Sequence, residues 1–102
     1  MLTPDSIAEK VRQVVTRPEY RDSVRRVRLF GSYLHGKAKK KSDVDLIVDL
    51  RGTIGLFEFV GLQLDLKKVL RRNVDLVTPH SLSKYIRKEV LSTAHVLYKQ
   101  PR

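Results

Sequence analysis

The chain has 102 residues, of which 41% are hydrophobic and 31% charged, and this composition suits one small folded domain spanning residues 1–102. Without cysteine the chain can form neither disulfides nor thiolate metal sites, as is typical of the cytoplasm, and no apolar run reaches the roughly 18–20 residues that span a bilayer. The net charge of +10 predicts attraction to polyanions such as nucleotides, nucleic acids or an acidic protein surface.

The first predicted element is a helix that begins at Thr3 or Asp5. Pro4 then lies near the first helical position, where its missing N–H and fixed φ are no disadvantage. Pro18 is expected to end this helix. Apolar residues at helical spacing predict one buried stripe, formed by Ile7, Val11, Val14 and Val15.

A strand is predicted next, over residues 24–30, and its alternate side chains point to opposite faces. One face carries Val27 and Leu29, and the other carries two arginines, Arg26 and Arg28. A turn or short helix then begins at Gly31 and runs to about Gly36, and residues 37–42 are predicted to form a polar, basic loop.

The second strand, residues 43–50, alternates cleanly between apolar and acidic positions. One face is apolar and consists of Val44, Leu46, Val48 and Leu50. The other face carries Asp43, Asp45, Ile47 and Asp49. Because Asp49 lies near the far end of the strand, we expect it to be solvated or paired with an arginine.

A long helix is predicted from about residue 56 to residue 72, after a turn marked by Gly52 and Gly55. Its core face consists of Phe59, Leu62, Leu66, Val69 and Leu70. A second apolar row is expected to be core as well, or to bind a partner or a second copy; this row consists of Phe57, Val60 and Leu64.

The rest of the chain is predicted to form a third strand, a last helix and a short edge strand. The third strand covers residues 74–77, and Pro79 ends it. Ser81 or Ser83 would cap the last helix, which runs through about Ser92. Its inward side chains would be Leu82, Ile86 and Val90. Residues 95–98 would add the edge strand.

Helices and strands therefore alternate in the order α-β-α-β-α-β-α, which indicates an α/β (α+β) domain with helices packed on a small mixed sheet of about three to four strands. The helices have enough apolar surface to cover one sheet face. The other face would carry Arg26, Arg28, Asp43, Asp45 and Asp75. An open, charged face of this kind is unusual unless it is a functional site.

Three aspartates on this face point to metal-assisted chemistry. Asp43 and Asp45 are two positions apart in a strand, so both carboxylates face the same solution and repel each other unless a cation lies between them. Mg²⁺ prefers oxygen ligands and accepts substrate phosphate oxygens. Asp75 has the same parity on the third strand, and three carboxylates can hold two metal ions about 3.5–4 Å apart. Asp75 could also deprotonate or orient an attacking hydroxyl.

Gly31 and Ser32 follow the first strand directly and suit phosphate binding. Glycine lets a backbone approach a ligand closely, the turn can aim N–H groups at an anion, and the Ser32 hydroxyl adds a donor. A lone Gly-Ser or Asp-x-Asp is a weak signal. In this order, on these elements and with Asp75 at matching parity, the residues favour a nucleotide site.

These segments resemble the polymerase-β nucleotidyltransferase superfamily. The similarity lies in residues 31–36, in the ten residues that separate Ser32 from Asp43, and in residues 43–48 and 74–79. It is greatest to the minimal nucleotidyltransferases, the MNT-type antitoxins of prokaryotic HEPN/MNT toxin–antitoxin pairs, and covers nearly the whole chain. The Gly-Ser-x10-Asp-x-Asp motif is specific to the superfamily, whereas the antitoxin assignment rests on small size and overall pattern.

The resemblance implies a role for each residue of the motif. Gly31 and Ser32 would bind the nucleotide phosphates, Asp43 and Asp45 would ligate Mg²⁺, and Asp75 would complete the catalytic carboxylates. Some family members transfer AMP from ATP to a tyrosine of the partner HEPN ribonuclease and so silence it. The resemblance therefore implies an antitoxin that transfers AMP and forms a hetero-oligomer with a HEPN toxin.

The chain departs from the family pattern at His35, where members often have an arginine that helps with the phosphates. A lysine of the following loop could compensate, and the candidates are Lys37, Lys39, Lys40 and Lys41. Otherwise His35 is a surface histidine of the turn and the lysine run is a solvated loop.

Two other functions fit parts of the sequence. An antitoxin could block its toxin by contact alone, with a vestigial metal site, but all three carboxylates are intact. A basic nucleic-acid-binding domain would fit the net charge, but the sequence has no helix-turn-helix or ribonucleoprotein signature. We therefore favour the enzyme over both alternatives.

Overall fold

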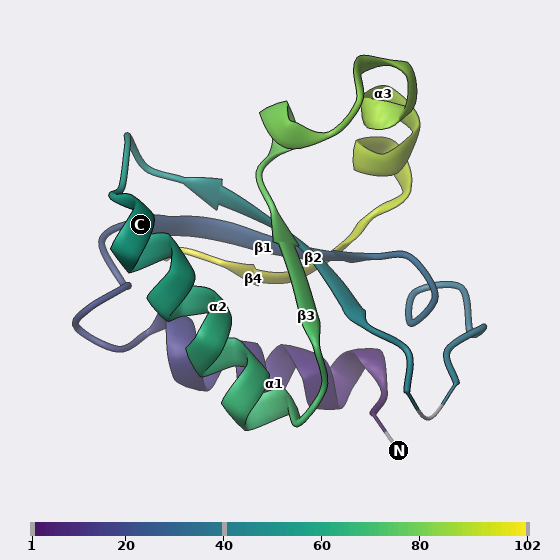
Figure 1. Ribbon diagram of the computed structural model, residues 1–102, viewed down its shortest axis with the longest axis horizontal. Helices are drawn as coiled ribbons and strands as arrows, with labels where there is room; N and C mark the ends of the chain where they lie inside the picture. Colours follow the sequence, from purple (N-terminus) through teal and green to yellow (C-terminus); the bar gives the residue numbers. More distant parts are fainter. Residues whose placement is uncertain (1, 40, 102) are drawn as a thin grey trace.

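A four-stranded mixed sheet forms the centre of the fold in the computed structural model, which describes residues 2–39 and 41–101 (Figure 1). The strand order is β3-β2-β1-β4. Strand β1 (Val24–Phe30) pairs antiparallel with β2 (Val44–Leu50) and with β4 (His95–Lys99), and β3 (Val74–Val77) runs parallel to β2. The predicted mixed sheet, including its edge strand near residue 95, is confirmed.

Helix α1 (Pro4–Val15) begins where its capping residues predict. The Thr3 hydroxyl accepts a hydrogen bond from the Ser6 N–H at 3.1 Å, and the Ser6 hydroxyl accepts one from the Thr3 N–H at 2.8 Å. The helix ends at Val15, before Pro18. The predicted stripe is fully buried in the core, as Ile7, Val11, Val14 and Val15.

Helix α2 (Leu56–Leu70) packs against α1 and β3 with the predicted core face. It buries Leu62, Leu66 and Leu70, and Phe59 and Val69 lie partly buried against the same cluster. The expectation that the second apolar row is also core is wrong, because the sheet and α1 cover only one side of α2 and leave that row exposed; it consists of Phe57, Val60 and Leu64. Within the described residues, no helix is long and apolar enough to cross a membrane.

The segment after β3 forms a short 3-10 helix, η1 (Pro79–Ser81), and helix α3 (Lys84–Thr93). Ser83 caps α3, as one of the two predicted candidates. Of the predicted inward side chains, which were Leu82, Ile86 and Val90, only Leu82 is buried, and it precedes the helix.

Hydrogen bonds join α3 to the preceding η1 segment. The Arg87 guanidinium donates to the carbonyl oxygens of Pro79, His80 and Leu82 at 2.9, 3.1 and 2.9 Å. Figure 1 shows α3 at the top of the view, apart from α1 and α2. Ile86 therefore remains about half exposed, in contrast to the prediction.

The sheet face opposite α1 and α2 is not open along its whole length, as the alternating pattern had suggested. Ile47 lies on this face and is fully buried. The register partner of Ile47 on β1 is Arg28, whose side chain is only 11% exposed. The short helix η1 also contacts β2. The acidic end of the face, at Asp43, Asp45 and Asp75, remains accessible to solvent.

Candidate active site

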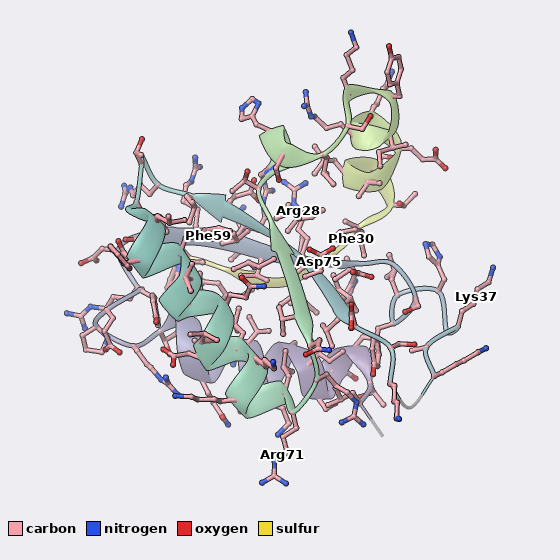
Figure 2. The ribbon with its side chains drawn as sticks, in the orientation of Figure 1. Arg28, Phe30, Lys37, Phe59, Arg71 and Asp75 are labelled. Atoms are coloured by element: carbon pink, nitrogen blue, oxygen red, sulfur yellow. The ribbon has the colours of Figure 1, made fainter. Side chains whose placement is uncertain are left out.

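The three aspartates singled out in the sequence meet at one end of the sheet. Asp45 of β2 is the direct register partner of Asp75 of β3, and Asp43 immediately precedes β2. On the other side Asp45 pairs with Phe30 of β1, so the three strands contribute one row of side chains to the same face. Figure 2 labels two members of this row, Phe30 and Asp75.

The electrostatics of this row are unbalanced. Burial raises the pKa of the Asp45 carboxyl above its ordinary value of 3.8, and repulsion from Asp75 and then from Asp43 raises it further. Within residues 2–39 and 41–101, the ion pairs involve Asp49 and Asp65 but none of these three carboxylates. The acidic end of the face therefore attracts a cation.

Gly31 lies directly against Asp45, which belongs with Asp43 and Asp75 to what we call the acidic row. Its φ is +75°, in the left-handed region that favours glycine. A β-carbon on Gly31 would overlap the Asp45 carboxylate and lie 2.9 Å from its Cγ. The sequence predicted that Gly31 lets the backbone approach a ligand closely. In the structure, the absence of a side chain at Gly31 lets the backbone approach the Asp45 carboxylate.

In the turn that begins at Gly31, two carbonyl groups accept backbone hydrogen bonds, whereas two donor groups of Ser32 make none among the described residues. Residues 31–36 form turns rather than a helix, with the Gly31 carbonyl accepting from the N–H groups of Leu34 and His35 at 3.2 Å. The Ser32 carbonyl accepts from Lys37 N–H at 2.9 Å. Among the described residues, neither the Ser32 N–H nor its hydroxyl has a partner. Both remain available to an anion.

The donor set of the three aspartates fits Mg²⁺, although no closed cage exists. Within the described chain, no group of three or more His, Cys, Asp or Glu side chains is placed to hold a metal by itself. Mg²⁺ usually keeps several waters and binds through one or two carboxylates together with substrate phosphates. The hard oxygen donors of Asp43, Asp45 and Asp75 suit a metal that arrives with a nucleotide.

Arg26 and Arg28 do not serve the acidic row. Both pair with Asp49, Arg26 through Nε at 2.9 Å and Arg28 through Nη2 at 3.3 Å. This confirms the expected arginine partner of Asp49. The shared carboxylate balances part of the charge of both arginines.

His35 and three of the loop lysines that could compensate for it lie on the surface. His35 is exposed on the turn, and Lys37, Lys39 and Lys41 are exposed on the loop, whereas Lys40 lies outside the described residues. Figure 2 shows Lys37 directed away from the sheet. A phosphate-binding role for this loop remains a prediction.

A large concavity among the described residues lies away from the acidic site. It measures about 1220 Å³ and lies at the other end of β2, where its lining includes Arg26, Asp49, Arg51, His80 and Lys99. The sequence did not indicate it, because its lining residues come from segments far apart in the chain. The aspartates instead occupy an open surface, which suits a large substrate.

Comparison with known proteins places these observations in one family. Residues 9–102 match the family described as polymerase beta, nucleotidyltransferase. The protein adenylyltransferase MntA of Thermococcus cleftensis is 39% identical over 87 residues, which cover 81% of this chain and 88% of that protein.

Solved structures share the fold. A toxin–antitoxin structure with AMP-PNP is 26% identical, with a TM-score of 0.74 over 90% of this chain and 73% of that chain. A complex of tri-AMPylated HEPN toxin with MNT antitoxin from Shewanella oneidensis has a TM-score of 0.68 at 23% identity, over 95% of this chain and 73% of that chain. At that identity the second likeness concerns the fold alone.

Proposed function

The chain belongs to the polymerase beta nucleotidyltransferase family, and we propose that it is a Mg²⁺-dependent antitoxin that transfers AMP from ATP to a tyrosine hydroxyl of a HEPN-family toxin. The in-register pair of Asp45 and Asp75, beside the Gly31 turn, carries this proposal. The 39% identity to a protein adenylyltransferase and the 26% identity to a toxin–antitoxin chain with AMP-PNP support it.

The Gly31 turn would bind the phosphates of ATP directly, and the acidic row would bind them through Mg²⁺. The Ser32 N–H and hydroxyl donate to phosphate oxygens, and Gly31 lets those oxygens come close to the backbone. Asp43, Asp45 and Asp75 would hold Mg²⁺, as two ions in the arrangement that suits in-line displacement, and the metal would offset the negative charge of the phosphate oxygens. The charge of +10 draws the nucleotide toward the domain.

The transfer step forms one bond and breaks one. The tyrosine oxygen attacks the α-phosphorus of ATP, a new O–P bond forms, the bond to the oxygen bridging to the β-phosphate breaks, and pyrophosphate leaves. The proton of the tyrosine hydroxyl passes to the Asp75 carboxylate. Asp75 is exposed on an edge strand, so a hydroxyl carried by a whole protein can reach it.

Asp45 suits a different role from Asp75. It is half-buried between Phe30 and Asp75 and lies against Gly31, so it faces the nucleotide rather than the acceptor. Asp43, exposed just before β2, shares the same end of the face. The acidic row thus runs from the nucleotide side to the acceptor side.

The test uses the product of the neighbouring gene, which the proposal expects to be a HEPN-domain protein, together with ATP labelled on the α-phosphate and Mg²⁺. We expect label on a tyrosine of the partner, located by mass spectrometry. Asp43→Asn with Asp45→Asn should abolish transfer, and Asp22→Asn, an exposed carboxylate outside the row, should not. If the double variant silences the toxin as well as the unchanged chain, the antitoxin acts by contact and the proposal fails.

A further inference from the structure

The outer face of α2 carries an apolar row that the fold does not use. Phe57 is 93% exposed, Val60 41% and Leu64 51%, and Leu56 beside them is 75% exposed. Positions 57, 60 and 64 are three and four residues apart, so they share one face of the helix. A contiguous apolar surface of this kind on a small domain marks an interaction site.

The same face becomes cationic in the last turns of α2. Lys67, Lys68 and Arg71 continue the helical spacing beyond Leu64. A pocket of about 440 Å³ lies here, and it is lined by Lys41, Lys67, Arg71, Arg72 and Asn73. No acidic residue lines this pocket.

These cations have no acidic partners within the described part of the chain, where the ion pairs use only Arg17, Arg26 and Arg28. The Nε of Arg72 is buried there without a hydrogen-bond partner. Cations stabilise the C-terminal end of a helix, which accounts for Lys67 and Lys68. It does not account for Lys41, which comes from the loop before β2, or for the unpartnered nitrogen of Arg72.

This face adjoins the catalytic end of the sheet. Gln63, at the border of the apolar row, donates to the carbonyl of Val74 in β3 at 2.8 Å. Strand β3 is the edge strand that carries Asp75. Figure 2 shows Arg71 at the lower end of α2 and Asp75 on β3. The side chain of Asp75 points to the sheet face opposite α2, so a protein that covers the outer face of α2 would contact Asp75 by extending around the β3 edge.

We infer that the outer face of α2, from Phe57 to Arg71, is the docking surface for the protein that carries the acceptor hydroxyl. The identity of that protein rests on the proposed function. Its matching surface presents apolar side chains opposite Phe57, Val60 and Leu64 and a cluster of carboxylates opposite Lys67 and Arg71. The pattern of apolar and cationic residues sets the orientation in which it binds.

Other occupants match this face less well. In a two-fold dimer, antiparallel α2 helices would set the apolar half of one against the cationic half of the other, and each chain carries +10. Nucleic acid would match the cations but not the aliphatic side chains of Val60 and Leu64. An acidic protein surface with apolar side chains satisfies both halves.

Calorimetry tests the surface by measuring how this chain binds the product of the neighbouring gene, which the proposed function expects to be a HEPN-domain protein. Phe57→Glu and Leu64→Glu should each weaken binding by roughly tenfold or more, as expected for central apolar contacts. Lys67→Glu with Arg71→Glu should weaken it and reduce its salt dependence. Tyr85→Glu and Lys88→Glu, at exposed positions of α3, are the matched controls and should bind as the unchanged chain does.

The transfer assay separates this inference from the proposed function. At saturating partner, the α2 variants should keep their turnover and show only a raised KM, because the aspartates are untouched. If binding depends on α2 but no AMP is ever transferred, the enzyme proposal fails and the surface stands. If the α2 variants bind the partner normally, or lose only self-association or RNA binding, the surface is wrongly assigned whatever the activity.

Discussion

The carboxylate of Asp45 lies against the α-carbon of Gly31, with no room for a β-carbon between them. The contact follows from the register of the sheet, because Asp45 pairs with Phe30, the residue before Gly31. The proposed phosphate-binding turn and the proposed metal-binding row are therefore one structural unit. A substitution in the turn should therefore displace the metal-binding carboxylate.

Gly31→Ala tests this unit. The variant should lose about 1–2 kcal/mol of stability from its left-handed φ and should bind ATP at least tenfold more weakly, because the new β-carbon displaces Asp45. Gly52→Ala is the matched control, since Gly52 has a φ of +76° and no atom within 4 Å of an added β-carbon. Thermal unfolding and ATP titration of both variants are the measurements. Equal ATP affinities would contradict the coupling.

Asp45→Asn should stabilise the domain at neutral pH in the absence of metal. The raised pKa means that the folded state holds the Asp45 proton more tightly than the unfolded state, so stability falls as the pH rises from near 3.8 through the folded pKa. Removing the charge should raise the Tm at pH 7 by on the order of a few °C. The gain should disappear below pH 3.8, where Asp45 is protonated in both states.

Asp49→Asn on the same strand is the control for that prediction and should change stability in the opposite direction. Asp49 pairs with Arg26 and Arg28, so its loss leaves two arginines without their carboxylate. Unfolding curves at several pH values, with EDTA present, compare the two variants. A lower Tm for Asp45→Asn at pH 7 would show that its charge is already balanced.

Asp75→Asn should separate binding from transfer. Asp75 is exposed on the edge strand, on the acceptor side of the row, so the variant should keep ATP binding. It should lose roughly 10²–10⁴-fold in transfer rate, the usual contribution of a general base. Single-turnover transfer and ATP titration are measured on the same preparation. Transfer near the unchanged rate would mean that another group takes the proton.

The basic loop offers a salt-dependent test. Lys37 and Lys39 are exposed, so replacing both by Ala should leave the fold intact and weaken ATP binding most at low ionic strength. Lys84 and Lys88, exposed on α3, provide a control pair of equal charge. Titrations at several salt concentrations distinguish the pairs. If ATP binds equally well to both variants at every salt concentration, the loop makes no contribution to ATP binding.

Local patterns in the sequence were sufficient for the elements and for the order of the site residues. Alternation predicted β2 and put Asp43 and Asp45 on one face, and the parity of Asp75 predicted its place beside them. Thr3 and Ser83, each one of two candidates that the sequence offered, are the residues that cap α1 and α3. These inferences succeed because capping and side-chain direction depend on residues only a few positions apart.

Only the tertiary structure decided which faces are covered and which charges meet. The sequence could not tell that Phe57, Val60 and Leu64 stay exposed, because their burial depends on what packs across α2 and not on the helix itself. Nor could it tell that Ile47 is buried on the charged face, or that Asp45 presses against Gly31. Each of these depends on strand order and register, which bring together residues from separate parts of the chain.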